Sequence, residues 1–295
     1  MLRPPILSPG AALRAQMAQG SVLLPGVFNG ISALSAYRAG ATALYVSGAG
    51  VTNASLGVPD IALANATEFA AASAAICQVV PVPVIADADT GFGEVWNVAR
   101  TVIEMERTGL AGIHLEDQVS PKRCGHLDGK GVIEVGHMAQ KVRAAVEAKR
   151  DPSFLIIART DARGIEGIDV AIDRANAYVD AGADVIFAEG LTSEDEFARF
   201  RDRVRVPLLA NMTEFGKTPL IPFSRFEQLG YELVIFPMTG FRVMLKALDE
   251  AFGELIQTGT QAGFLDRMRT RTELYATLDY DEYQARDASY GGAKV

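Results

Sequence analysis

The chain has 295 residues, of which 49% are hydrophobic and 22% charged, and its formal net charge is −8 at pH 7. These proportions are typical of a soluble globular protein that can bury a sizeable core. The acidic balance argues against nucleic acid or an anionic membrane as the main partner, because both favour basic surfaces, and no apolar stretch approaches the roughly 18 residues of a membrane span. A small anionic substrate is still compatible, since its local site can be cationic.

Two cysteines, Cys77 and Cys124, are too few for a disulfide framework. Residues 1–20 lack the basic start, apolar centre and cleavage site of a secretory signal. We therefore expect the protein to stay in the reducing cytoplasm. Cys77 lies in an apolar helical segment and is expected to pack in the core.

The first predicted element is a short helix with Ser8 as its N-cap, Pro9 at its first position and Gly20 as its stop. From residue 22 onward, short β-branched or aliphatic stretches alternate with longer helical segments, as parallel strands with crossover helices require. Strands are predicted at 23–28, 43–47, 82–87, 112–116, 154–159, 185–189, 207–211 and 233–237. Helices are predicted at 31–38, 67–79, 95–107, 135–149, 170–181, 194–203, 224–229 and 241–256.

This alternation predicts an α/β fold. Eight strand–helix units in about 240 residues are typical of a (β/α)8 barrel of the TIM type. The competing fold is a doubly wound open sheet, but its dinucleotide fingerprint is incomplete, because Asn53 stands in place of the third glycine after Gly48 and Gly50. The sequence therefore favours the barrel.

We find no linker and predict a single domain over 1–295. It comprises an N-terminal helix at 1–20, the barrel at 22–256, and a C-terminal helical extension and tail at 257–295. The helical sequence at 264–283 has an apolar face that we expect to pack on a neighbouring subunit. The tail from Ala285 is expected to be mobile.

Polar residues stand at the carboxyl ends of nearly all the predicted strands, where barrels of this type build their active sites. They are Tyr45, Ser47, Asp87, Asp89, His114, Glu116, Asp117, Arg159, Asp161, Glu189, Asn211 and Thr213. Any one of them is about as often a helix cap or a loop charge as a functional residue. Their recurrence at successive strand ends predicts one common site.

Asp87 and Asp89 are two residues apart, so both carboxylates point to the same side of the strand. With Glu116 on the next strand, they could hold a hard divalent cation such as Mg²⁺, directly or through its waters. Without a cation, three carboxylates in one cavity would repel one another and raise one another's pKa. The cations that would then balance the charge of a substrate with several carboxylates are Lys122, Arg123, Arg159, Arg242 and Arg271.

The loop 122–126 contains two cations, a thiol and an imidazole within five residues. Nearby positive charge favours the thiolate, so Cys124 could exchange a proton near neutral pH. The alternative interpretation is that Cys124 is a small buried hydrophobic residue. Glycines at 125, 129 and 131 would allow the loop to close over a ligand.

Several segments together resemble the isocitrate lyase and phosphoenolpyruvate mutase superfamily, namely 45–48, 87–93, 115–118, 122–126, 158–162 and 211–216. The resemblance extends from about residue 9 to residue 283 and is closest to the 2-methylisocitrate lyases. It implies an α/β barrel whose last helix is exchanged between subunits, usually in a homotetramer. It also implies Mg²⁺-dependent cleavage of 2-methylisocitrate to pyruvate and succinate in propionate breakdown, the methylcitrate cycle.

The resemblance also implies site residues. It places the metal site at Asp87 and Asp89, to which our reasoning from the strands adds Glu116, and it matches Cys124 and Gly125 to the catalytic loop. Residues 47–49 match the segment that binds the oxo-acid end of the substrate. The substrate-binding set is Ser47, Gly48, Ala49, Asp60, Arg123, Gly125, Arg159, Glu189, Asn211, Met212, Thr213, Arg242 and Arg271. Phe187 and Pro237 resemble residues that leave space for the additional methyl group.

In the hypothetical mechanism, protonated Cys124 completes succinate, while Arg159 and His126 stabilise developing charge and Lys122 helps to hold the substrate. Tyr45 is the candidate base, provided that the metal and the cations lower its pKa from about 10. Leu127 follows the loop histidine where many 2-methylisocitrate lyases have Arg. The alternatives are therefore a 2,3-dimethylmalate lyase, an oxaloacetate decarboxylase or a non-catalytic barrel subunit.

Overall fold

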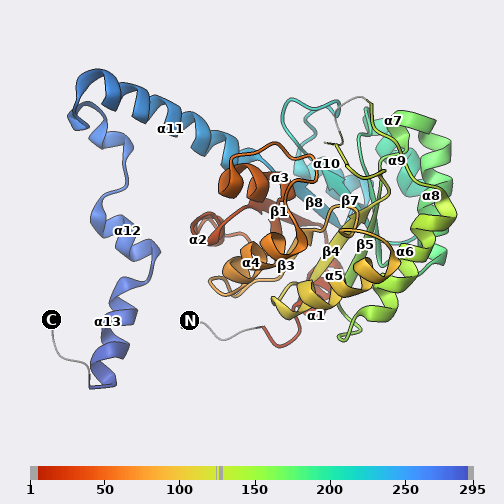
Figure 1. Cartoon of the computed structure of the whole chain (residues 1–295), viewed down its shortest axis with the longest axis horizontal. Coiled ribbons are helices and arrows are strands. Elements are labelled where there is room, and N and C mark those ends of the chain that lie inside the picture. The colour runs from red at the N-terminus through yellow and green to blue at the C-terminus, as the bar shows by residue number, and fades with distance from the viewer. Residues whose placement is uncertain (1–5, 124, 126–128, 292–295) are drawn as a thin grey trace.

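Eight parallel strands close into a barrel in chain order, with β8 hydrogen-bonded to β1 (Figure 1). The computed structural model describes residues 6–123, 125 and 129–291, so Cys124 and His126 lie outside the described residues. The strands are β1 Val22–Val27, β2 Leu44–Val46, β3 Val84–Asp87, β4 Gly112–Glu116, β5 Leu155–Thr160, β6 Val185–Ala188, β7 Leu208–Asn211 and β8 Leu233–Phe236. The predicted (β/α)8 barrel is confirmed, and each predicted strand agrees with the structure to within two residues at either end.

The main helices form at the predicted places. They are α1 Pro9–Met17, α2 Gly30–Arg38, α4 Ala66–Cys77, α5 Val95–Arg107, α6 Val135–Ala148, α8 Ile168–Asp180, α9 Glu194–Arg203, α10 Phe223–Leu229 and α11 Thr239–Thr258. The prediction missed three short helical segments in the connections after β2 and β5, namely α3 Gly48–Val51, η1 Thr52–Leu56 and α7 Arg163–Glu166. Such segments have too few residues to show a helical period.

Helix α1 closes the amino-terminal end of the barrel. Ser8 is its N-cap, since Ser8 Oγ accepts a hydrogen bond from Ala11 N at 3.3 Å. Leu13 is fully buried among the side chains of the barrel interior, which contributes about 1.5–3 kcal/mol to stability. Arg14 pairs with Asp184 at 2.6 Å and holds the helix to the start of β6.

The strands separate the core into two layers by their alternation. Tyr45, Ile157 and Phe187 belong to the cluster inside the barrel, whereas Ala86, Ile113 and Ala158 belong to the cluster between the barrel and its helices. A side chain two residues from an interior residue on the same strand also faces the interior. This rule decides which polar residues can reach the mouth of the barrel.

Helix α11 is formed at the predicted place but leaves the barrel instead of covering it (Figure 1). Within α11, which the structure describes in full, only Phe241 is buried. The chain continues as an arm through η2 Ala262–Arg267, α12 Arg271–Thr277 and α13 Tyr280–Ser289. The tail predicted to be mobile from Ala285 is thus helical as far as Ser289.

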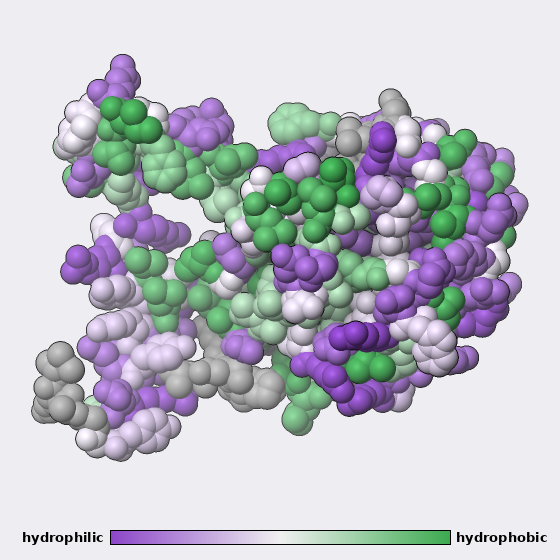
Figure 2. All heavy atoms as spheres, in the orientation of Figure 1, coloured by the Kyte–Doolittle hydropathy of each residue, from purple (hydrophilic) through white to green (hydrophobic). Residues whose placement is uncertain are grey.

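The departure of α11 leaves an apolar groove of about 580 Å³ on the outside of the barrel, between β1, α2 and the start of α11. Leu23 of β1 is 38% exposed there, although outward residues of β4 and β5 are buried under helices. In Figure 2, hydrophobic residues also lie along α11. Among the residues described, none of the helices combines the length and apolar character that crossing a bilayer requires.

Candidate active site

The inward-facing polar residues meet at the carboxyl ends of the strands, around a cavity of about 70 Å³. Because Ile113 and Leu115 pack against the helices, His114 and Glu116 of β4 point into the barrel. The predicted site residues that line the cavity are Tyr45, Ser47, Ala49, Asp60, Asp87, Lys122, Arg123, Gly125, Arg159, Glu189, Asn211 and Thr213. Its apolar wall consists of Phe187, Ile235, Pro237 and Met238.

Lys122 joins the loop 122–126 to the acidic side of the site. Its Nζ lies 2.5 Å from Asp60 Oδ1 and 2.9 Å from Asp89 Oδ1. Burial alone would lower the pKa of Lys122, but the carboxylates of Asp89 and Glu116 raise it above its usual value. The group is therefore a permanent cation in this site.

Asp89 is held in a left-handed backbone conformation, with φ of 46°, which is uncommon for a residue other than glycine. Its backbone N–H donates to Asp87 Oδ1 at 2.8 Å, so the two carboxylates of the predicted metal site are fixed relative to each other. Burial and the charge of Asp87 raise the pKa of Asp89 to about 7. A nearby cation therefore strongly stabilises the ionised form of Asp89.

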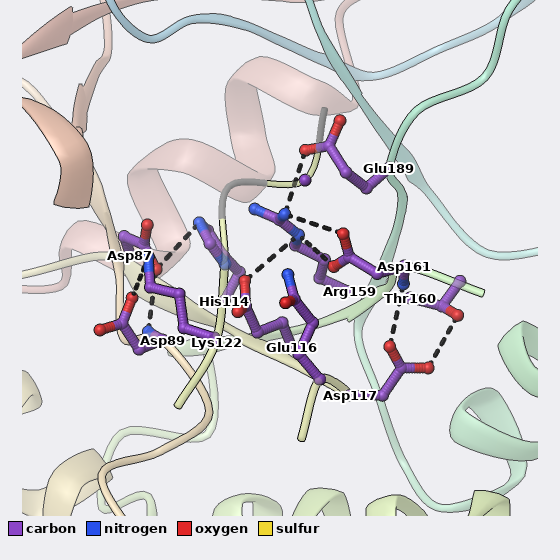
Figure 3. Close-up of polar contacts among 12 residues, drawn as sticks. Asp87, Asp89, His114, Glu116, Asp117, Lys122, Arg159, Thr160, Asp161 and Glu189 are labelled. Carbon is purple, nitrogen blue, oxygen red and sulfur yellow. Dashed lines mark hydrogen bonds and ion pairs between the residues drawn. The ribbon is translucent and has the colours of Figure 1, made fainter. Parts of the chain in front are cut away.

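Arg159 is the cation at the centre of the site (Figure 3). Its Nε lies 2.9 Å from Asp161 Oδ2 and 3.4 Å from Glu116 Oε2, and its NH2 lies 3.4 Å from Glu189 Oε2. Burial alone would lower the pKa of Arg159, but these carboxylates raise it. The guanidinium also lies over the ring of Phe187, 5.0 Å from its centroid, so its orientation is fixed by packing as well as by charge.

Tyr45 and His114 form a buried pair, with the hydroxyl of Tyr45 2.9 Å from His114 Nε2. Burial, followed by the charge of Asp87, raises the pKa of Tyr45 well above its usual value. Burial also lowers the pKa of His114 to about 4, so that its ring is neutral. The described side chains together therefore do not supply the lowered pKa that a base role for Tyr45 requires, and its hydroxyl shares a hydrogen bond with His114.

A second layer of polar residues supports the first. Asp117 Oδ2 accepts hydrogen bonds from Thr160 Oγ1 and Tyr178 OH, both at 2.8 Å, and Asp117 Oδ1 accepts from Asp161 N at 2.9 Å. Arg174 NH1 lies 3.6 Å from Asp117 Oδ2. Asp117 is thus a strand-end residue that orients Asp161 beneath Arg159 and does not line the cavity.

The three predicted metal ligands do not form a complete coordination shell. Within the described part of the chain, no group of three or more His, Cys, Asp or Glu side chains is arranged to hold one ion. Asp87, Asp89 and Glu116 could hold Mg²⁺ with water or substrate completing its shell. Two observations fit such an ion: Glu116 Oε1 is buried without a hydrogen-bond partner, and burial raises the pKa of Glu116 well above its usual value.

Four predicted substrate-binding residues lie apart from the cavity. Met212 packs its side chain in the layer between the barrel and the helices, because it follows the inward-facing Asn211. Gly48 lets Asp87 approach closely, since a Cβ at this position would lie 2.4 Å from Asp87 Oδ2. Arg242 pairs with Glu214 at 3.4 Å, and Arg271 is exposed at the start of α12 on the arm.

The prediction missed Ile235 and Met238, which add to the apolar wall. It also assigned no role to Lys130, whose ammonium group is buried next to Asp161. Ile235 alternates with Leu233 on its strand, and this period of two could have placed it inside the barrel. Lys130 lies in a segment without a period, so no local signal was available for it.

A closed parallel barrel with buried carboxylates and cations at the carboxyl ends of its strands defines a barrel enzyme acting on small anionic molecules. The family model described as phosphoenolpyruvate phosphomutase matches residues 13–256. The chain belongs to this family, within the superfamily of phosphoenolpyruvate mutase and isocitrate lyase.

Relatives of known function cover almost the whole chain. A 2-methylisocitrate lyase from Aeropyrum pernix is 52% identical over 289 residues, which are 98% of this chain and 93% of the relative. A crystal structure of 2,3-dimethylmalate lyase has a TM-score of 0.92 and 37% identity, covering 98% of this chain and 97% of its own. A structure of oxaloacetate acetylhydrolase with the inhibitor 3,3-difluorooxalacetate has a TM-score of 0.94 and 35% identity, covering 99% of this chain and 100% of its own.

Proposed function

We propose that this protein is a carbon–carbon lyase that cleaves 2-methylisocitrate to pyruvate and succinate. The observation that carries the proposal is that three cations, Lys122, Arg123 and Arg159, and an apolar wall meet in one cavity. Lys122 and Arg159 suit a substrate with several carboxylates, and Phe187 and Pro237 suit its methyl group. The 52% identity to a 2-methylisocitrate lyase supports the same activity.

We propose Mg²⁺ as the cofactor, held by Asp87, Asp89 and Glu116 together with water or substrate. Bound there, the ion would supply Lewis-acid polarisation of the hydroxyl and carboxylate oxygens of the substrate. The buried carboxylates Asp87, Asp89, Glu116 and Glu189 outnumber the cations Lys122 and Arg159 among the residues described here, so a divalent cation would relieve their repulsion.

In this proposal the residues of the chain bind the substrate and move its protons. The hydroxyl proton of 2-methylisocitrate passes to solvent, and the bond between the carbinol carbon and the neighbouring carbon breaks. The carbinol carbon becomes the carbonyl carbon of pyruvate, and the electron pair of the broken bond stays on the dicarboxylate fragment. The thiol of Cys124 gives its proton to that carbon and completes succinate. Arg159 and His126 stabilise the developing negative charge, and Tyr45 contributes a hydrogen bond.

Replacing Cys124 with Ser tests the proposal. We expect Cys124→Ser to reduce turnover of 2-methylisocitrate at least about 100-fold, since general acid catalysis commonly contributes this much, while pyruvate still binds in the presence of Mg²⁺. Pyruvate release would be followed in a coupled assay, with and without EDTA. Full turnover by the variant would contradict the role of Cys124. Wild-type turnover that EDTA leaves unchanged would contradict the requirement for Mg²⁺.

The most relevant rival is a 2,3-dimethylmalate lyase, because a solved structure of that enzyme shares the barrel with a TM-score of 0.92. Oxaloacetate decarboxylation would use the same cavity. Comparing kcat/KM for 2-methylisocitrate, isocitrate, 2,3-dimethylmalate and oxaloacetate separates these activities. Absence of Mg²⁺-dependent turnover on all four would favour a non-catalytic barrel subunit.

We also propose that the chain works as a homotetramer in the cytoplasm, as one barrel domain over 1–295 whose helix α11 packs on a neighbouring subunit. The apolar groove beside β1 and the exposed apolar residues of α11 support this exchange, since each surface lacks a partner within the described residues. Cys77 is a free thiol that is partly buried against the core, which fits a reducing compartment.

A further inference from the structure

Lys130 follows the loop 122–126 and is buried, with 6% of its side chain exposed. Its Nζ donates a hydrogen bond to the carbonyl oxygen of Gly125 and another, at 2.9 Å, to Asp161 Oδ1. Asp161 is fully buried and also accepts from Arg159 Nε and NH2, at 2.9 and 3.2 Å. One carboxylate therefore links the Lys130 ammonium to the cation at the centre of the site.

The backbone at Gly125 lies directly against that cation. A Cβ at position 125 would lie 2.4 Å from Glu189 Cγ and 2.5 Å from Arg159 NH2. A small displacement of Gly125 therefore changes the distance between the loop and the substrate-binding side chains.

The other side of the loop is anchored in a similar way. Gln118 is buried, its Nε2 donates to the carbonyl oxygen of Arg123 at 2.8 Å, and its Oε1 accepts from the N–H of the same residue at 2.9 Å. The residues immediately before and after position 124 are thus each held by a buried polar side chain.

We propose that Lys130 is a positioning residue, which holds the Gly125 backbone against Asp161 and Arg159, and that the proton transfer assigned to the preceding residue in the sequence, Cys124, depends on this anchor. This inference rests on the proposed function, in which Cys124 delivers the proton. Lys130 itself touches no reacting atom. Its effect passes through the Gly125 carbonyl, to which Lys130 donates a hydrogen bond.

The contacts predict how removing Lys130 affects kcat and KM separately. Arg159 keeps Glu116 and Glu189 within 3.4 Å when Lys130 is removed, so the cation that binds the substrate stays in place. The loop, in contrast, loses its link to Asp161. Misplacing a catalytic group by about 1 Å can lower the rate about 100-fold, so kcat should fall by about this factor and KM should change much less.

The test compares Lys130→Met with Lys130→Arg and with a matched control. Lys149 makes the same kind of contacts at the opposite end of the barrel, with its Nζ 3.1 Å from both Phe154 O and Asp184 Oδ2. Lys149→Met therefore removes a comparable ion pair, which is partly buried, with side chains 12% and 16% exposed. The measurements are kcat and KM for 2-methylisocitrate, the melting temperature, and hydrogen–deuterium exchange of the peptide 119–133 in the full-length protein.

We expect Lys130→Met to lower kcat about 100-fold and to accelerate exchange in 119–133, and Lys130→Arg to restore both in part. Lys149→Met should lower the melting temperature similarly and leave kcat and this peptide unchanged. Unchanged exchange and kcat in Lys130→Met would overturn the inference, as would equal loss of kcat in Lys149→Met. An inactive wild type would overturn the proposed function instead, and the exchange measurement would still decide whether Lys130 holds the loop.

Discussion

At the scale of single residues, burial changes what a side chain can do in this site. Tyr45 has a phenol that the sequence suggests as a base, yet its desolvation and the adjacent Asp87 raise its pKa. The pKa of Asp89, only two residues from Asp87, is raised to about 7 by the same two causes. The residue type alone therefore does not decide the protonation state, because the neighbours and the loss of water decide it.

Gly125 provides a test at this scale. We expect Gly125→Ala to lower kcat by about 100-fold, because the new methyl group would overlap Glu189 and Arg159 and displace the loop. Steady-state kinetics and thermal unfolding would be compared with Gly136→Ala. Gly136 lies in α6, and a Cβ added there would meet no atom within 4 Å, so this control should keep full activity and gain about 0.5–1 kcal/mol in stability. Normal turnover by Gly125→Ala would show that the close approach is unimportant.

Among the helices, α11 is unusual because it projects away from the barrel (Figure 1). Most of its apolar residues are exposed, with Val243 at 68%, Phe252 at 56% and Ile256 at 84%. The arm that follows contacts α2 of its own chain, where Arg38 pairs with Asp279 at 2.5 Å. A surface of this kind is stable in water when another apolar surface covers it. The groove beside β1 is also lined mainly by apolar residues.

Phe252→Glu tests whether a second copy covers α11. If it does, the buried carboxylate would weaken association by about 2 kcal/mol or more, and the variant should shift toward smaller species in sedimentation velocity and light scattering. Trp96→Glu is the control, since Trp96 is an 87% exposed aromatic residue on α5. It should leave the assembly unchanged. A wild type that is monomeric at all concentrations would contradict the exchange of α11.

At the scale of the whole molecule, an acidic chain carries a site with concentrated charge of both signs. The net charge of −8 does not repel an anionic substrate from the site, because Lys122 and Arg159 are buried cations at its mouth and interactions with distant surface charges are screened by salt. The barrel makes this possible by bringing together residues as far apart in the chain as Tyr45 and Thr213.

Mg²⁺ should stabilise the whole fold in a pH-dependent way. The folded pKa of Asp89, about 7, exceeds its ordinary value of 3.8. The metal-free folded protein therefore binds this proton more tightly than the unfolded chain, and the resulting stability is present below the ordinary value and lost as pH rises to about 7. An ion bound at Asp89 replaces the proton, so added Mg²⁺ should raise the melting temperature more at about pH 8 than at about pH 5.5.

Differential scanning fluorimetry with Mg²⁺ or EDTA would measure this difference. Asp89→Asn should reduce both the shift with Mg²⁺ and its dependence on pH. Equal shifts at the two pH values in the wild-type protein, or no shift at either, would rule out a metal ion at Asp89.

Local sequence patterns were sufficient to predict the barrel and the strand ends that meet at the site. The alternation of short apolar strands with helices predicted every strand, because the periods of two and 3.6 are local properties of the backbone. The carboxyl-end rule then placed Asp87, Glu116 and Arg159 together. The same alternation, applied to Asn211 and Met212, would also have removed Met212 from the set of cavity residues.

Contacts between distant segments could be identified only in the folded chain. The link from Lys130 through Asp161 to Arg159, the raised pKa of Tyr45 and the departure of α11 from its barrel all depend on residues that are neighbours in space but far apart in the chain. Hydrogen bonds and desolvation act over a few ångströms in three dimensions. Periodicity along the chain does not indicate which side chains come within that distance of one another.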